Sequence, residues 1–83
     1  MYERIRAILA GHAGMSANIA DIGDNDDLYR AGMKSMATVQ LMLALEEAFD
    51  LEFPEELLTR TTFRSVSTIA QALRSVDPNA ATA

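Results

Sequence analysis

The sequence predicts an all-α fold: a small four-helix bundle of three main helices and one short helix, with a long first loop. Three observations favour this class. The chain has 83 residues, which fit one small domain. Apolar residues recur at helical spacing in three separate segments, and the stretch between the first two segments has no lasting period. Because 49% of the residues are hydrophobic, the chain can build a modest core, which argues against disorder.

The first helix is expected over residues 2–11. Ile5, Ile8 and Leu9 recur there at helical spacing and predict one buried face. Gly11 suits a helix end because glycine readily adopts the left-handed conformation that follows the last turn. We therefore expect this helix to end near Gly11 and His12.

Residues 13–34 are predicted to form the long loop. The segment is rich in glycine, asparagine and aspartate. Loops of this length in small domains tend to be functional or disordered. Within it, Leu28 and Tyr29 are expected to insert into the core, with Asp27 ahead of them as a cap.

Residues 35–49 form the strongest predicted helix. They contain no glycine or proline and many good helix formers. One face carries a core stripe at spacings of three, four, seven and eleven residues. Its members are Thr38, Leu41, Met42, Leu45 and Phe49.

A second apolar stripe on the same helix contains Met36, Val39 and Leu43. It has two interpretations, which are packing under another helix and docking of a partner. We expect a mixture, in which Val39 lies mostly inside while Met36 and Leu43 lie partly outside.

The chain should leave this helix in an extended form, because residue 53 precedes proline and is therefore disfavoured in a helix. Pro54 suits the first position of a short helix. Leu57 and Leu58 would supply the buried face of that helix.

Thr62 is predicted to cap the last helix. The expected inward-facing residues are Phe63, Val66, Ile69, Ala70 and Leu73. Residues 76–83 contain Pro78 and small residues, which predicts a flexible C-terminal tail after a domain that spans residues 1–75.

Composition excludes several function classes. The net charge is −5, and residues 21–56 hold ten acidic and two basic residues. This balance argues against nucleic acid or an anionic membrane as a partner, because both require basic patches. The chain contains no cysteine, which excludes disulfides, a thiolate nucleophile and a thiolate metal site. No apolar run reaches the roughly 18 residues of a membrane span and no signal-peptide pattern opens the chain, so we expect a cytoplasmic protein. We also expect it to be a monomer.

The residues do not favour an enzyme or a metal site. His12 is the only histidine and fits a surface or helix-capping role. The acidic run that begins at Asp24 fails the calcium-loop register, because Leu28, Tyr29 and Ser35 occupy positions that need a ligand, a glycine and a carboxylate. A small hydrolase that uses Ser35 lacks any sign of an oxyanion hole.

Ser35 stands where the long loop meets the longest helix. One interpretation makes it the N-cap, with its oxygen accepting a hydrogen bond from a free amide of the first turn. The other makes it an exposed modification site, because a phosphate attached there would lie near the positive end of the helix. Gly32 permits the tight turn that this corner requires.

The sequence resembles the acyl and peptidyl carrier proteins over about residues 2–75. The segments that carry the resemblance are Asp27-Leu28-Tyr29, Gly32-Met33-Lys34-Ser35-Met36, Val39-Gln40-Leu41, Leu45-Glu46-Glu47-Ala48-Phe49-Asp50, Leu51-Glu52-Phe53-Pro54 and Thr61-Thr62-Phe63. The family's glycine-x-aspartate-serine-leucine/methionine motif maps onto residues 32–36. The resemblance implies that Ser35 bears a 4′-phosphopantetheine arm, which a Mg²⁺-dependent phosphopantetheinyl transferase transfers from coenzyme A.

Three positions depart from the family pattern. Lys34 replaces the usual aspartate, and Ala37 and Gln40 stand where fatty-acid carriers often have acidic residues. The resulting surface looks more like the peptidyl or stand-alone aminoacyl carriers, which a dedicated ligase loads. The residues that we expect to contact partners are Lys34, Met36, Ala37, Gln40, Leu43 and Glu47.

The favoured function is a discrete, non-catalytic carrier that holds an aminoacyl or acyl group as a thioester and presents it to a downstream acceptor enzyme. Because the chain has no thiol of its own, the arm would have to supply one. The alternative is an unmodified acidic helical adaptor that binds a partner through Met36, Val39 and Leu43. The adaptor would bind equally well after Ser35→Ala, whereas a hydrolase would react with a serine-directed probe.

Overall fold

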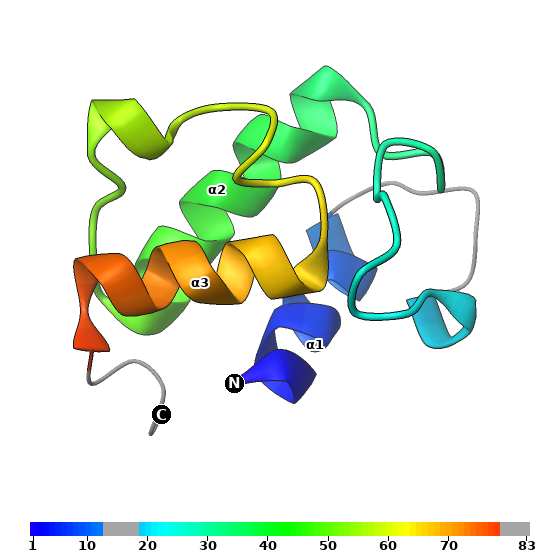
Figure 1. Ribbon diagram of the computed structural model, residues 1–83, viewed down its shortest axis with the longest axis horizontal. Helices are drawn as coiled ribbons and strands as arrows, with labels where there is room; N and C mark the ends of the chain where they lie inside the picture. The colour runs from blue at the N-terminus through cyan, green and yellow to red at the C-terminus, as the bar shows by residue number, and fades with distance from the viewer. Residues whose placement is uncertain (13–18, 79–83) are drawn as a thin grey trace.

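The protein is described by a computed structural model that covers residues 1–12 and 19–78, and it contains three α-helices and two short 3-10 helices (Figure 1). The α-helices are α1 (Tyr2–His12), α2 (Ser35–Phe49) and α3 (Val66–Val76), and the 3-10 helices are η1 (Ile19–Asp21) and η2 (Glu55–Leu57). α1 packs against both α2 and α3. The described residues contain no strand, so the all-helical prediction is confirmed.

α1 forms as predicted and buries Ile5 and Leu9, while Ile8 is half-buried. Arg6 also ties this helix to the following loop. Its guanidinium contacts the Asp24 carboxylate at 2.6 Å and donates a hydrogen bond to the Ile19 carbonyl at 3.1 Å. The His12 side chain lies outside the described part of the molecule, so its predicted role is not tested.

The described part of the long loop is anchored in the core. Ile22, Leu28 and Met33 are buried, and Tyr29 is half-buried. Asp27 acts as the predicted cap, because its Oδ1 accepts a hydrogen bond from the Tyr29 amide at 2.9 Å. The loop therefore reaches α2 along a fixed path.

Backbone hydrogen bonds join this loop to the start of α3. The Leu28 amide donates to the Arg64 carbonyl at 2.7 Å, and the Ser67 amide donates to the Asp24 carbonyl at 2.9 Å. These hydrogen bonds join the loop before α2 to the start of α3, although more than thirty residues separate the two segments in sequence.

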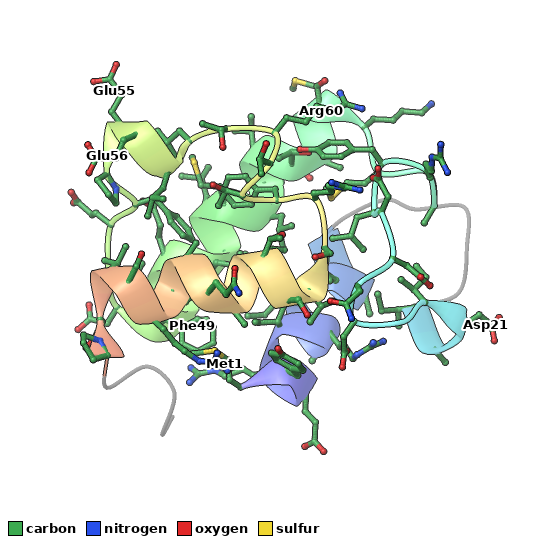
Figure 2. The ribbon with its side chains drawn as sticks, viewed as in Figure 1. Met1, Asp21, Phe49, Glu55, Glu56 and Arg60 are labelled. Atoms are coloured by element: carbon green, nitrogen blue, oxygen red, sulfur yellow. The ribbon has the colours of Figure 1, made fainter. Side chains whose placement is uncertain are left out.

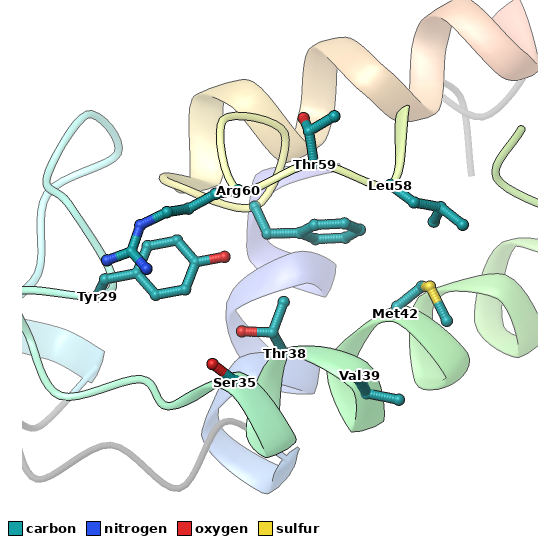
Figure 3. A pocket seen from close by; sticks show the side chains of 9 residues that line it. Tyr29, Ser35, Thr38, Val39, Met42, Leu58, Thr59 and Arg60 are labelled. Carbon is teal, nitrogen blue, oxygen red and sulfur yellow. The ribbon is translucent and has the colours of Figure 1, made fainter. Parts of the chain in front are cut away.

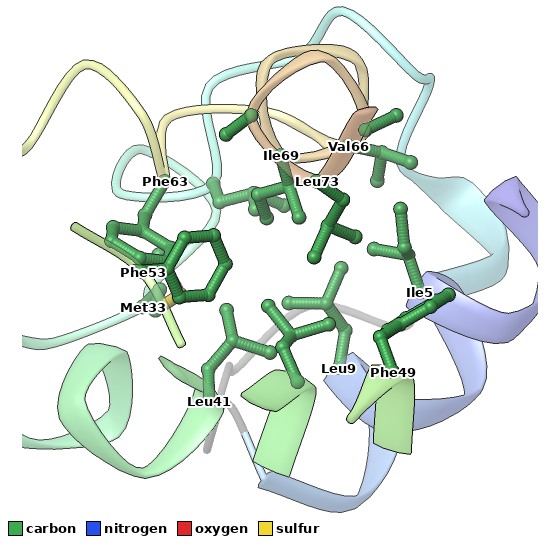
Figure 4. Close-up of a cluster of buried hydrophobic side chains, with 14 of the residues drawn as sticks. Ile5, Leu9, Met33, Leu41, Phe49, Phe53, Phe63, Val66, Ile69 and Leu73 are labelled. Carbon is green, nitrogen blue, oxygen red and sulfur yellow. The ribbon is translucent and has the colours of Figure 1, made fainter. Parts of the chain in front are cut away.

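The core stripe of α2 lies in the centre of the fold (Figure 4). Leu41, Leu45 and Phe49 are buried as predicted, whereas Thr38 and Met42 are only half-buried. Phe53 and Phe63 close the core beside Leu41, with their rings in an edge-to-face contact at 5.4 Å between centroids.

Two predictions about burial are wrong. Val39 is 50% exposed and Leu58 is 45% exposed, although both were expected inside. The short helix after Pro54 is a 3-10 turn that half-buries Leu57 alone, and Pro54 precedes the turn as its cap. The Val39 and Leu58 side chains both line a surface groove between α2 and the segment that follows η2 and do not fill the space between them.

The capping prediction for α3 is also wrong. Ser65, not Thr62, is the N-cap, and Phe63 lies before the helix although it is buried as expected. The Ser65 hydroxyl accepts a hydrogen bond from the Thr68 amide at 3.1 Å, and the Thr68 hydroxyl accepts one from the Ser65 amide at 3.0 Å. This reciprocal capping box satisfies two amides that the helix cannot pair internally. The other predicted inward residues of α3 are all buried: Val66, Ile69, Ala70 and Leu73.

Ser65→Ala is expected to lower the free energy of unfolding by about 1 kcal/mol, because it removes the cap from a buried helix start. Urea denaturation measures the loss. Ser75→Ala is the control, since Ser75 is exposed within α3 and should change stability by less than about 0.5 kcal/mol. Equal effects of the two changes would contradict the assignment.

Val76 was expected to open the flexible tail, but it is the last residue of α3. α3 continues through Val76, which is half-buried, and residues 79–83 of the expected tail lie outside the described residues. Within residues 1–12 and 19–78, none of the helices has the length and apolar character to cross a membrane.

Candidate functional site

Ser35 is the first residue of α2 and is exposed at the corner where the loop enters the helix. Gly32 adopts a φ of 114°, the left-handed region that the predicted tight turn requires. Met33, the next residue, is buried in the core and fixes the turn to it. Together they hold the Ser35 hydroxyl at the surface.

Interpretation of Ser35 as the N-cap is wrong. Lys34 occupies the N-cap position with extended backbone angles, and no side chain caps this end of α2. The Lys34 carbonyl instead accepts hydrogen bonds from the Thr38 amide at 3.0 Å and the Thr38 hydroxyl at 3.1 Å. The Ser35 hydroxyl is therefore not engaged in holding the helix.

A groove of about 250 Å³ begins at Ser35 and runs between α2 and the segment 58–63 (Figure 3). We call it the Ser35 groove. Its walls are formed by Tyr29, Ser35, Thr38, Val39, Met42, Leu58, Thr59, Arg60 and Phe63. Apolar side chains and hydroxyl groups dominate this lining, so the groove suits an uncharged chain better than an ion.

Arg60 gives the Ser35 groove its positive charge. Its guanidinium lies 4.1 Å from the centre of the Tyr29 ring, a stacked cation–π arrangement. Figure 3 shows Arg60 and Tyr29 together at one end of the groove, and Leu58 and Met42 at the other. Among the nine lining residues there is no carboxylate and no histidine. The described groove therefore lacks a general base.

The predicted partner-contact residues are mostly at the surface, but they fall on two sides of α2. Lys34, Met36, Gln40, Leu43 and Glu47 are exposed, and Ala37 is half-buried. Gln40, Leu43 and Glu47 line a second groove between α1 and α2, of about 650 Å³, together with Arg4 and Ile8. Of the six, Lys34 and Met36 are the direct neighbours of Ser35 in the chain.

Sequence reasoning missed the other wall of the Ser35 groove. Thr59 and Arg60 line it, and Leu58, which was expected in the core, points into it. The sequence around Leu58, Thr59 and Arg60 contains no motif that indicates a binding site. The stacking of Arg60 on Tyr29 joins residues that lie about thirty positions apart, which helical spacing cannot reveal.

The corner fits a phosphodiester and offers no metal site. Lys34 provides a cation beside the free hydroxyl, and the amides of the first turn of α2 favour an anion. Over the described residues, no three histidine or acidic side chains gather closely enough to hold a metal ion.

Comparison with known proteins decides the family. The family described as phosphopantetheine attachment site matches residues 3–73 of this chain. The chain belongs to this family of carrier proteins. The predicted family and its cofactor, 4′-phosphopantetheine, are therefore confirmed.

Individual relatives agree with this assignment. The carrier protein is 45% identical over 76 residues to an aminoacyl carrier protein of Agrobacterium fabrum, covering 92% of both chains. It is similar to a carrier protein from Agrobacterium tumefaciens in the crystal structure of an engineered Bradyrhizobium japonicum glycine:carrier protein ligase complexed with that protein and AMP. That match has a TM-score of 0.87 and 46% identity and covers 89% of this chain and 99% of the other. A structure of the Bradyrhizobium japonicum ligase complexed with glycylated carrier protein matches with a TM-score of 0.74 and 30% identity, over 86% of this chain and 95% of the other.

Proposed function

We propose that this protein carries an aminoacyl group as a thioester on a 4′-phosphopantetheine arm attached to Ser35. The observation that carries the proposal is the Ser35 hydroxyl, which is exposed at the start of α2 and takes no part in capping the helix. It stands within residues 3–73, the part of the chain that matches the attachment-site family.

The neighbouring residues support a tether at this position. The turn at Gly32 and the buried Met33 fix the corner, so the attacking oxygen stays accessible to a transferase. Lys34 would balance the single negative charge of the phosphodiester. Because the chain has no cysteine, the thiol at the end of the arm supplies the thioester chemistry.

The protein itself is proposed to be non-catalytic. The residues that line the Ser35 groove include no base or carboxylate that could activate a substrate. We therefore assign chemistry to three partners: a phosphopantetheinyl transferase, an ATP-dependent aminoacyl ligase and an acceptor enzyme. Coenzyme A and ATP are cytoplasmic reactants, which favours a cytoplasmic location. We also propose that the carrier domain spans residues 1–75 and is a monomer.

The relatives favour an amino acid over a fatty acid as cargo. One is an aminoacyl carrier protein, and others occur in complexes with a glycine:carrier protein ligase. The weak acidity around Ser35 agrees, since Lys34, Ala37 and Gln40 replace residues that are often acidic in fatty-acid carriers. Glycine is accordingly the first cargo to test.

Loading by a ligase tests the proposal. The arm-bearing protein, incubated with glycine, ATP, Mg²⁺ and the Bradyrhizobium japonicum glycine:carrier protein ligase, should gain the mass of one glycyl group. Hydroxylamine should release that group, because it cleaves thioesters. The protein without the arm is the control and should gain nothing. Glycine transfer to this control would contradict a thioester on the arm.

The exposed apolar stripe keeps the adaptor as a second candidate. Met36 is 75% exposed, Val39 50% and Leu43 56%, which is typical of a docking surface. A carrier would use the same stripe to meet its enzymes. The adaptor would bind its partner equally well after Ser35→Ala and lose it after Leu43→Glu, whereas transfer of cargo by a carrier requires Ser35.

A further inference from the structure

We propose that Arg60 makes the Ser35 groove selective for uncharged acyl ends, so that a cationic aminoacyl group stays outside the groove, in solvent. This inference rests on the proposed function, since it concerns the cargo of the arm on Ser35. It assigns to Arg60 a specificity role in deciding which cargo the carrier shelters and which it presents.

The groove has the composition of a site for a short uncharged chain. Val39, Met42 and Leu58 form its apolar walls, and the hydroxyls of Thr38 and Thr59 add uncharged polar groups. Its volume of about 250 Å³ is small. Because Ser35 lies on its rim, an arm attached there begins at the groove (Figure 3).

Arg60 is the one charged residue among the nine that line the groove. Its position is held by stacking on Tyr29 at 4.1 Å, so the cation stays at the rim. Neither of the ion pairs found in the described residues, Arg6–Asp24 and Arg64–Asp27, includes Arg60. No carboxylate of the described residues therefore forms an ion pair with its guanidinium.

An aminoacyl thioester carries a free ammonium group at neutral pH, whereas a fatty or other simple acyl thioester carries no charge. Moving an ammonium into an apolar groove costs free energy unless a carboxylate pairs with it, and none lines this groove. Arg60 adds like-charge repulsion at the same place.

The phosphodiester on Ser35 does not remove this barrier. It would bring one negative charge to the corner, where Lys34 and Arg60 together bring two positive charges. The rim of the groove therefore stays positive after the arm is attached. The amino acid remains exposed to its acceptor enzyme, and an uncharged acyl end folds partly into the groove.

A matched pair of cargoes tests the inference. Glycyl and propionyl groups have the same number of non-hydrogen atoms and differ by an ammonium in place of a methyl. Both are attached to Ser35 from their coenzyme A thioesters by a promiscuous phosphopantetheinyl transferase. Amide ¹H–¹⁵N spectra are then compared with the protein that bears the free-thiol arm. Propionyl should shift the amides of Thr38, Val39 and Met42, and glycyl should leave them unshifted.

Charge reversal at Arg60 is the second part of the test. Arg60→Glu places a carboxylate at the rim, so glycyl should now shift the same amides to an extent comparable with propionyl. The control is Arg74→Glu, because Arg74 also stacks on a tyrosine, 6.0 Å from the Tyr2 ring centre, but lies outside the groove. This control should leave glycyl without effect.

Three results would overturn the inference: equal shifts by both cargoes in the unaltered protein, no shift by either, or a glycyl spectrum that Arg60→Glu does not change. Failure of the proposed function would look different. In that case Ser35 would accept no arm in the first step, and neither cargo could be attached.

Discussion

Replacement of Ser35 by alanine is expected to abolish attachment of the phosphopantetheine arm and to leave the fold intact. The hydroxyl is the proposed attachment atom, and the described surface offers no cysteine thiol that could take its place. Intact-mass spectrometry after incubation with coenzyme A, Mg²⁺ and a promiscuous transferase measures the result. The unaltered protein should gain one phosphopantetheine group and the Ser35→Ala variant none.

The stability of the Ser35→Ala variant distinguishes an attachment role of Ser35 from a capping role. An N-cap serine would cost about 1 kcal/mol when replaced by alanine, whereas Ser35 makes no capping hydrogen bond and should cost less than about 0.5 kcal/mol. Ser75→Ala is the matched control and should keep the mass gain. A Ser35→Ala variant that still gains one arm would refute the assignment.

Phe49→Ala is expected to lower the free energy of unfolding by about 3–5 kcal/mol. The Phe49 ring is only 6% exposed, and it packs at the end of α2 against the central core. The Arg4 guanidinium lies 4.6 Å from the ring centre and donates a hydrogen bond to the Ala48 carbonyl, so it covers the ring from the α1 side. Met1 packs, partly buried, against the core cluster that contains Phe49, and Figure 2 labels both residues. Removal of the ring would lose both the buried surface and the stacking.

Urea denaturation checks this prediction, with Leu43→Ala as the control on the same helix. Leu43 is 56% exposed, so its truncation should cost less than about 1 kcal/mol. Nearly equal losses for the two variants would mean that the buried face of α2 is assigned incorrectly.

Helical spacing predicted the core of α2 because a long helix offers many turns over which one face can repeat. Leu41, Leu45 and Phe49 recur on that face, and all three are buried. The same argument failed for Val39 and Leu58. Their burial depends on how closely the segment after η2 approaches α2, and the two side chains line a groove there instead of filling it.

Caps were predicted less well because several residues near a helix start have suitable side chains. Thr62 and Ser65 can both accept a hydrogen bond from an amide, and only the backbone path selects Ser65. At α2 the sequence made Ser35 a candidate cap, although Lys34 holds the N-cap position. A free Ser35 hydroxyl is thus a feature of the three-dimensional structure.

The charged side chains lie in different parts of the molecule, and composition alone does not give their positions. Glu55 and Glu56 point outward at η2, away from the corner of α2, while Arg60 lies toward that corner (Figure 2). Glu55 and Glu56 therefore do not border Ser35. Lys34 and Arg60 place two cations near Ser35, which the overall net charge of −5 does not indicate.

The most direct test of the whole account is peptide mass spectrometry of the protein isolated from its native cells. The peptide that contains Ser35 should carry 4′-phosphopantetheine, and a fraction of it should carry an amino acid in thioester linkage. Finding the Ser35 peptide unmodified in every molecule would contradict the carrier function proposed for this residue.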